Sequence, residues 1–242
     1  MAEKIVVGDI HGGFKALKQV LQKIGDPDRF DYIFLGDYID GWSESFDVIE
    51  YLIGFSKQQN CIFLRGNHDP LAADWLKGKV ADPVWLKHGG QATCDSYLLA
   101  DAAARRNHIE FFDSLKDFHE DNQGRLFIHA GFSSVKGPHH EAHASTLIWD
   151  RSLWELAIAV DPRIPKDSSR FPARLKLYKE IFIGHTPVTH LGETVPVQGC
   201  NVWNVDTGAA AKGCLTAMNI ETKEYWQSDR LKELYPTEKE RN

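Results

Sequence analysis

The chain has 242 residues, a length that suits one large domain. Hydrophobic residues make up 43% of it and charged residues 26%, which provides a core and excludes a disordered, collagen-like or low-complexity protein. Its net charge of −6, from 28 basic and 34 acidic residues, argues against a protein that binds long nucleic acids through a strongly basic face.

The sequence also carries signals about compartment. It contains no run of the roughly 20 apolar residues that a membrane span requires, and its first residues lack the apolar core of a signal peptide. The cysteines are scattered without a C-x-x-C pair, so we expect reduced thiols; they are Cys61, Cys94, Cys200 and Cys214. Together these features predict a cytoplasmic protein with no membrane partner.

Short apolar runs that end abruptly in polar residues recur along the chain, at residues 4–7, 32–35, 61–64, 126–128, 181–183 and 202–205. Runs this short and this continuously apolar are typical of buried strands. Between the first of them, apolar residues at helical spacing predict two helices, one through Phe14, Leu17, Leu21 and Ile24 and one through Phe46, Ile49, Leu52 and Ile53. This strand–helix–strand order predicts a largely parallel central sheet.

The polar residues that follow these strands are Asp, Asn and His. In an open α/β sheet the ligand binds beyond the carboxyl ends of the strands. We therefore expect these side chains to converge on one edge of the sheet, which is the central prediction from the sequence.

The rest of the chain fits one domain over residues 1–242. Residues 71–123 have helical spacing, and residues 133–178 read as an insertion that caps the site, with a His-rich turn at His139, His140 and His143. A solvated turn is the favoured interpretation of these histidines; an extra ion is the alternative. After Val188 the pattern favours antiparallel strands, and we expect the polar residues 235–242 to fray.

Five motifs follow the predicted strands. Each alone fits a turn or a hydrogen-bonded core histidine, but the ordered set resembles the calcineurin-like metallophosphoesterases. It is most similar to their bacterial and phage phosphoprotein-phosphatase-like branch, to which symmetrical dinucleoside tetraphosphatases belong. The resemblance spans Val7 to about Ala217 and implies an α/β fold of two mixed β-sheets packed as a sandwich with flanking helices. The motifs are Gly8-Asp9-Ile10-His11-Gly12, Gly36-Asp37-Tyr38-Ile39-Asp40-Gly41, Gly66-Asn67-His68-Asp69, His129-Ala130-Gly131 and Gly184-His185-Thr186.

The resemblance also implies a dinuclear metal centre. Two divalent ions neutralise phosphoryl oxygens and turn a bound water into hydroxide near neutral pH. Oxygen and nitrogen donors without cysteine suit Mn²⁺, Fe or Zn²⁺, and we expect Mn²⁺. By resemblance, the first ion is held by Asp9 and His11, both ions are bridged by Asp37, and the second is held by Asn67, His129 and His185.

Two further residues carry catalytic roles by resemblance. His68 protonates the leaving-group oxygen, and Asp40 orients it; an imidazole beside a carboxylate is a suitable general acid at neutral pH. Alternatively, His68 is another metal ligand, and Asp40 is a turn residue that caps the following helix.

The chain departs from the eukaryotic-type phosphatases after Asp40. Those enzymes have an arginine there that clamps the substrate phosphate, whereas this chain has Gly41, which cannot supply a bidentate guanidinium. Arg151 resembles the second phosphate-binding arginine of the bacterial branch, with Arg65 in reserve unless it is a surface charge. Trp42 is a candidate for stacking on a nucleobase or aromatic ester. The other tryptophans considered, Trp85, Trp149, Trp154 and Trp203, are expected to pack in the core.

The sequence thus predicts a phosphatase that hydrolyses phosphate monoesters, serine/threonine-protein-phosphatase-like, by attack of a hydroxide held at the dinuclear centre. Its expected partners are a phosphorylated small molecule, a nucleotide or a phosphoprotein. Two alternatives remain: cleavage of a dinucleoside polyphosphate, and a catalytically silent module that holds a phosphorylated partner through its metals.

Overall fold

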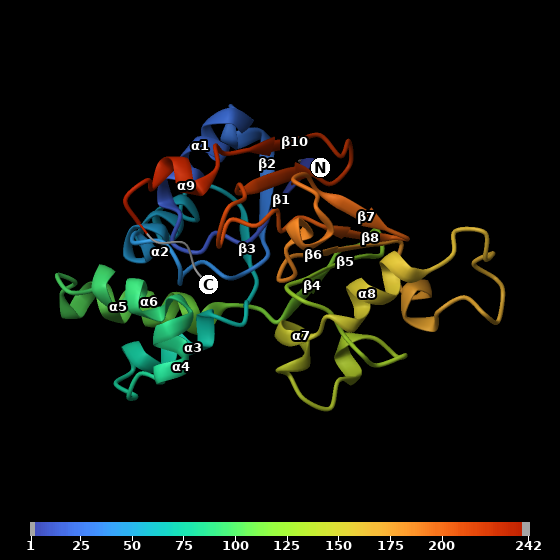
Figure 1. Cartoon of the computed structure of the whole chain (residues 1–242), viewed down its shortest axis with the longest axis horizontal. Helices are drawn as coiled ribbons and strands as arrows, with labels where there is room; N and C mark the ends of the chain where they lie inside the picture. The colour runs from blue at the N-terminus through green and yellow to red at the C-terminus, as the bar shows by residue number, and fades with distance from the viewer. Residues whose placement is uncertain (1–2, 239–242) are drawn as a thin grey trace.

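The computed structural model describes residues 3–238, which form two mixed, five-stranded sheets packed against each other, with helices outside them (Figure 1). In the first sheet the order is β10-β9-β1-β2-β3; β1, β2 and β3 are parallel, and β9 and β10 are antiparallel additions. Its strands are β1 (Glu3–Val7), β2 (Phe30–Phe34), β3 (Cys61–Phe63), β9 (Thr216–Asn219) and β10 (Tyr225–Gln227).

In the second sheet the order is β4-β5-β6-β8-β7. Here β5, β6 and β8 are parallel, while β4 and β7 run antiparallel at the two edges. The antiparallel pairing predicted after Val188 is therefore correct for β7 with β8 and for β9 with β10, but β8 also pairs in parallel with β6. The strands are β4 (Phe118–Glu120), β5 (Arg125–Ile128), β6 (Glu180–Ile183), β7 (Val197–Gly199) and β8 (Val202–Asn204).

Helices cover the outer faces of the sandwich. Most of the region 71–114 is helical, as the spacing of its apolar residues predicted, but the prediction is wrong at residues 118–120, which form β4. The α-helices are α1 (Phe14–Ile24), α2 (Ser45–Phe55), α3 (Asp69–Leu76), α4 (Pro83–Trp85), α5 (Gln91–Ser96), α6 (Ala102–Ser114), α7 (Thr146–Trp149), α8 (Ser152–Ala159) and α9 (Leu231–Leu234). Shorter turns are η1 (Pro27–Arg29), η2 (Leu86–Gly90, a π-turn), η3 (Pro138–His140), η4 (Ala173–Lys176) and η5 (Val188–Leu191).

Successive side chains of each strand point to opposite faces of its sheet, which explains how the layers of the fold pack. In β1, Ile5 and Val7 pack towards the helices on the outer face, whereas Val6 points into the layer between the sheets. There it meets residues of the second sheet such as Phe127 and Phe182, whose rings stack with centroids 5.1 Å apart. The predicted sandwich of two mixed sheets is confirmed.

Ion pairs join the two sheets at the end where β1, β5 and β6 begin. Lys4 of the first sheet pairs with Asp121 beside the second (3.2 Å), and Arg125 of the second pairs with Glu221 beside the first (2.7 Å). Arg125 is 1% exposed. This end lies opposite the strand ends that carry the predicted motifs.

Residues 133–178, which connect β5 to β6, hold α7 and α8, and their apolar side chains, among them Leu153 and Trp154, pack against the second sheet. The fraying expected from residue 235 is wrong at Tyr235, which is buried and stacks on Trp42 with centroids 5.1 Å apart. Residues 239–242 lie outside the described part. No helix within residues 3–238 is long and apolar enough to cross a membrane.

Candidate metal centre

The loops after β1, β2, β3, β5 and β6 meet in one place, as the strand order predicted. Four of their non-glycine residues have positive φ angles: His11 (52°), Asp37 (52°), Asp40 (71°) and His185 (66°). Backbone strain of this kind costs about 1–3 kcal/mol per residue and concentrates at functional sites. These side chains are therefore held in position at a cost in conformational free energy.

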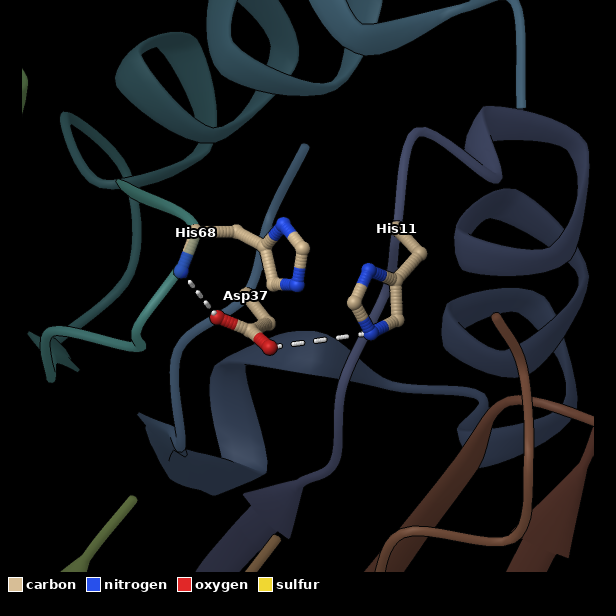
Figure 2. A group of neighbouring side chains, drawn as sticks. All are labelled: His11, Asp37 and His68. Atoms are coloured by element: carbon tan, nitrogen blue, oxygen red, sulfur yellow. Dashed lines mark hydrogen bonds and ion pairs between the residues drawn. The ribbon is translucent and has the colours of Figure 1, made fainter. Parts of the chain in front are cut away.

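The first group of possible ligands is His11, Asp37 and His68, whose ligand atoms lie within 4.8 Å of one another (Figure 2). Nε2 of His11 is 3.7 Å from Oδ2 of Asp37 and 3.9 Å from Oδ2 of Asp9. Nδ1 of His11 lies 2.9 Å from the carbonyl oxygen of Asp40. Because Nδ1 must donate to that carbonyl, Nε2 keeps a lone pair for an ion.

The second group is Asp37, His129 and His185, again within 4.8 Å. Nε2 of His129 is 3.5 Å from Oδ2 of Asp37, and its Nδ1 is 2.8 Å from the carbonyl oxygen of Leu35. Oδ1 of Asn67 lies 3.1 Å from Nε2 of His129 and 2.9 Å from Nδ1 of His185. Asp37 is thus shared by both groups, the arrangement that a bridging carboxylate requires.

The histidines of the second group are held in their neutral form. Burial lowers the pKa of His129, and burial together with the neighbouring His129 lowers the pKa of His185 to about 2. An imidazole must be neutral to bind a metal ion. Both side chains are therefore ready to act as ligands at neutral pH.

The carboxylates respond differently to their surroundings. Burial raises the pKa of Asp9, and the negative charges of Asp206 and Asp37 raise it further. Burial also pushes the pKa of Asp37 upwards, but the neighbouring imidazoles of His129, His68 and His11, together with the backbone N–H of His68, outweigh it and lower the pKa. Three buried acids so close together require a compensating positive charge.

Two glycines make room for the carboxylates. A Cβ atom at Gly66 would overlap Oδ1 of Asp37, and one at Gly184 would overlap Oδ1 of Asp9. Both glycines belong to the motifs that carry the resemblance.

Asp69 pins the loop that carries Asp37. Its carboxylate accepts the backbone N–H groups of Gly66 (2.7 Å), Asp37 (3.0 Å) and Tyr38 (3.1 Å). The acidic residue at this position therefore orients the shared carboxylate without contacting substrate.

The donor set fits a pair of divalent cations. Oδ1 of Asp9 and Nε2 of His185 are buried without a hydrogen-bond partner among the described residues, and such orphaned atoms require another partner. Ions of this class bind at about 2.0–2.2 Å, so two ligands of one ion lie at most about 4.4 Å apart. The spacings of 3.5–3.9 Å around Asp37 meet that limit.

A cavity of about 620 Å³ opens above these residues, far larger than one phosphate group. Arg151 lines it, with Nη1 donating to Oγ1 of Thr186 (3.0 Å), next to His185. Trp149, 53% exposed, presents its ring edge-on to His185 at 6.0 Å. The wall is built by residues 71–88 on one side and by residues 149–151 and 187–210 on the other.

His68, a member of the first group, forms a buried pair with Asp40, in which its Nδ1 is 2.6 Å from Oδ2 of Asp40. Asp40 does not cap α2, since the N-cap residue is Glu44, whose side chain makes no capping hydrogen bond. The imidazole of His68 faces the space shared with Asp37 and His11 (Figure 2).

Two side chains that were predicted to contact the substrate lie outside the cavity. Arg65 forms an ion pair with Asp117, donates to the carbonyl oxygen of Leu115 (2.9 Å) and lines a separate cavity. Trp42 is 1% exposed, and its Nε1 donates to the carbonyl oxygen of Ala209 (2.7 Å). Both interpretations are corrected: packing against distant segments turns these side chains away from the cavity.

Gly41 itself has a φ of 127°, so the backbone at the position of the missing arginine favours glycine. The imidazole of His139 lies 3.4 Å from Glu120 and against Phe118, outside both ligand groups, which agrees with the solvated turn.

Sequence reasoning missed the roles of two tryptophans. Trp149 was expected in the core but stands at the cavity wall, and Trp85 is buried but donates to Asp40 (2.5 Å). The available signal for Trp149 was its place two residues before Arg151. Nothing in the sequence distinguishes Trp85 from a packing residue.

Comparisons with known proteins agree with this geometry. The calcineurin-like phosphoesterase family model matches residues 5–209. The chain is 23% identical to the asymmetrical bis(5′-nucleosyl)-tetraphosphatase PrpE of Geobacillus sp. over 90% of this chain and 91% of that protein. It is 41% identical to the serine/threonine-protein phosphatase 2B catalytic subunit A1 of Saccharomyces cerevisiae, but over only 26% of this chain and 12% of that protein.

In three dimensions the chain is similar to a Saccharomyces cerevisiae protein serine/threonine phosphatase, with a TM-score of 0.60, 16% identity and coverage of 94% of this chain and 80% of that one. That likeness extends to the whole sandwich. With a family model that matches most of its length and metal-ligating groups at the strand ends, the chain belongs to the calcineurin-like phosphoesterases, hydrolases that act on phosphate esters.

Proposed function

We propose that this enzyme is a phosphatase that hydrolyses phosphate monoesters, phosphoserine and phosphothreonine proteins included, with two divalent cations, preferentially Mn²⁺, at the centre around Asp37. One observation carries the proposal: Asp37 is shared by two ligand groups at the base of a cavity that Arg151 also lines. Asp9 and His11 would hold the first ion, with Asn67, His129 and His185 holding the second.

When bound, such a pair of cations neutralises the phosphoryl oxygens and lowers the pKa of an attacking water. The side chains of the protein supply the remaining steps. Arg151 binds the phosphate through its guanidinium group and fixes its orientation. As the bond from phosphorus to the water oxygen forms and the ester P–O bond breaks, His68 donates its Nε2 proton to the departing oxygen. Asp40 holds the imidazole in place.

Dinucleoside polyphosphates are the second candidate substrate. The observation that favours them is the match with the Geobacillus tetraphosphatase over 90% of this chain. The size of the cavity and the exposed ring of Trp149 would accommodate a nucleotide. A silent binding module is disfavoured, because the two ligand groups, with Asp9 and Asn67 beside them, and the His68–Asp40 pair lie together.

The test compares p-nitrophenyl phosphate, a phosphoserine peptide and diadenosine tetraphosphate at equal concentration, with Mn²⁺, Zn²⁺ or Fe²⁺ added to metal-free protein. We expect the highest activity with Mn²⁺ and a higher kcat/KM for the peptide than for the dinucleotide. Substitution of His68→Asn should lower kcat at least 100-fold, the contribution of a general acid. Faster turnover of the dinucleotide would select the second candidate, and no turnover of any substrate would support the silent module.

A further inference from the structure

Asp40 is bonded at both carboxylate oxygens by residues from the helical region between β3 and β4. Nε1 of Trp85 donates to Oδ2 (2.5 Å), and Oγ1 of Thr93 donates to Oδ1 (2.6 Å). The same Oδ2 faces Nδ1 of His68 at 2.6 Å. All four side chains are buried. The pair that the proposed mechanism uses is therefore one end of a longer, fully enclosed network.

The donors in this network decide where its hydrogens lie. An indole nitrogen can only donate, and the Thr93 hydroxyl, which receives the backbone N–H of Asp40 (3.0 Å), returns its own hydrogen to Oδ1. A carboxylate that accepts at both oxygens favours a donor as its third partner. The hydrogen between Asp40 and His68 therefore belongs to Nδ1, and the imidazole is fixed in one orientation.

The backbone around Trp85 is shaped to hold the indole there. The segment that follows Trp85 is a kink between α4 and α5, in which His88 and Gly89 have non-helical backbone angles. A Cβ atom at Gly90 would overlap the indole ring. Gly89 has a φ of 108°, and its carbonyl oxygen accepts the N–H of Gly41, the residue after Asp40 (3.3 Å). The turn thus fastens Trp85 and the Asp40 loop to each other.

We propose that Trp85 and Thr93 are positioning residues that, through Asp40, lock the orientation of the general acid His68 and keep a hydrogen on its Nδ1. This inference rests on the proposed function, because it assigns a task only if His68 donates a proton to the leaving oxygen. Neither residue belongs to the two ligand groups. Trp85 also lines the cavity, but the role proposed here is the hydrogen bond from its Nε1 to Asp40.

A leaving-group series tests the inference. Proton donation matters most for a poor leaving group and little for one that departs as a stable anion. For Trp85→Phe and Thr93→Val we expect kcat for an alkyl phosphate, phosphoserine, to fall about tenfold, in the range typical of residues that orient others. With 2,4-dinitrophenyl phosphate, kcat should change less than twofold, and metal content and KM should be retained.

The matched control is Trp203→Phe, the same deletion at a position where the buried Nε1 has no hydrogen-bond partner. Trp203→Phe should leave the ratio of the kcat values for the two substrates unchanged. In a His68→Asn background, Trp85→Phe should have no further effect on kcat, since its target is already absent. If Trp85→Phe lowered kcat equally for both substrates, the role of Trp85 would be merely structural, and the inference would be overturned.

The outcome for His68→Asn separates the two claims. If His68→Asn is not selective for the poor leaving group, the proposed role of His68 fails. If His68→Asn is selective but neither Trp85→Phe nor Thr93→Val is, only the positioning role fails. Using both variants keeps the test valid if one of them folds poorly.

Discussion

At the metal centre, single residues are specified by the space around them as much as by their ligand atoms. Asp9 and Asp37 reach their positions only because Gly184 and Gly66 present no side chain there. The left-handed backbone of His11 and Asp37 then turns the two side chains towards each other. The conformational cost at Asp37 is compensated by the hydrogen bonds that the Asp69 carboxylate accepts from the backbone N–H groups of Asp37 and Gly66, and bound ions would compensate it further.

Substitution of Gly184→Ala tests this packing at the residue scale. The new methyl group must displace Oδ1 of Asp9, so we expect bound metal to fall below two ions per chain and kcat to drop at least 100-fold. Gly54→Ala in α2 is the control, because a Cβ atom there meets nothing within 4 Å; it should keep both metal and activity. Metal content is measured by emission spectrometry. Full occupancy in Gly184→Ala would contradict the packing argument.

Between elements, polar contacts at buried positions decide how the sheets and helices fit together. Arg125 in β5 reaches Asp121 (2.8 Å) and Glu221 (2.7 Å), and so ties the second sheet to the turn after β9. His108 in α6 similarly joins Glu50 of α2 (3.0 Å) and the hydroxyl of Tyr97 (2.7 Å). Neither network touches the metal centre, so both should affect stability rather than chemistry.

Arg125→Met should lower the free energy of unfolding by about 3 kcal/mol, since it removes one of the two cationic partners of the buried Asp121 carboxylate. Arg163→Met removes an ion pair to Asp161 in which the arginine side chain is 88% exposed, and should leave the free energy of unfolding nearly unchanged. Urea titration measures both, with kcat at 25 °C unchanged. Equal stability of the two variants would show that the ion pairs between the sheets contribute little.

His108 predicts a pH dependence of stability. Burial lowers the pKa of this imidazole in the folded protein, although the neighbouring Glu50 raises it. The unfolded chain therefore binds a proton more readily, and the free energy of unfolding falls as pH drops below the unfolded pKa of about 6.5. Between pH 7.5 and 5.5, the native protein should lose more stability in urea titrations than His108→Gln does. Equal losses of stability in the native protein and in His108→Gln would show that His108 does not cause the pH dependence.

The sequence predicted what local periodicity and strand direction determine. Strand ends placed Asp9, Asp37 and Asn67 at one edge because the parallel strands β1, β2 and β3 share that edge. The single central sheet expected from the strand order is wrong for His129, which follows a strand of the second sheet. The fates of Trp42 and Arg65 depended instead on contacts across the molecule, with Tyr235 and Asp117 respectively, and no local pattern contains such contacts. For the same reason the role of Trp85 could not be predicted, because its partner Asp40 is 45 residues away in the chain.

At the scale of the whole molecule, the candidate metal centre also brings together residues of both sheets. Asp9, His11 and Asp37 follow strands of the first sheet, whereas His129 and His185 follow strands of the second. Bound cations would therefore connect both halves of the sandwich at the end opposite the ion pairs of Arg125. Ligands that bind only the folded state stabilise it by mass action.

Removal of metal should lower the melting temperature. At 100 times the dissociation constant the gain is about 2.7 kcal/mol, which for a chain of this size corresponds to roughly 5–10 °C. Differential scanning calorimetry with EDTA, and then with Mn²⁺ restored, measures the shift. Asp37→Ala, which lacks the shared carboxylate, should show little response to Mn²⁺. An unchanged melting temperature in the native protein would mean that the ions do not join the sheets.

Anomalous diffraction at the manganese edge, from crystals grown with Mn²⁺, tests the dinuclear centre most directly. We predict two peaks about 3.5–4 Å apart, one on each side of the Asp37 carboxylate. The peak near His11 should be distinct from the peak near His129 and His185. A single peak, or two peaks away from Asp37, would contradict the account.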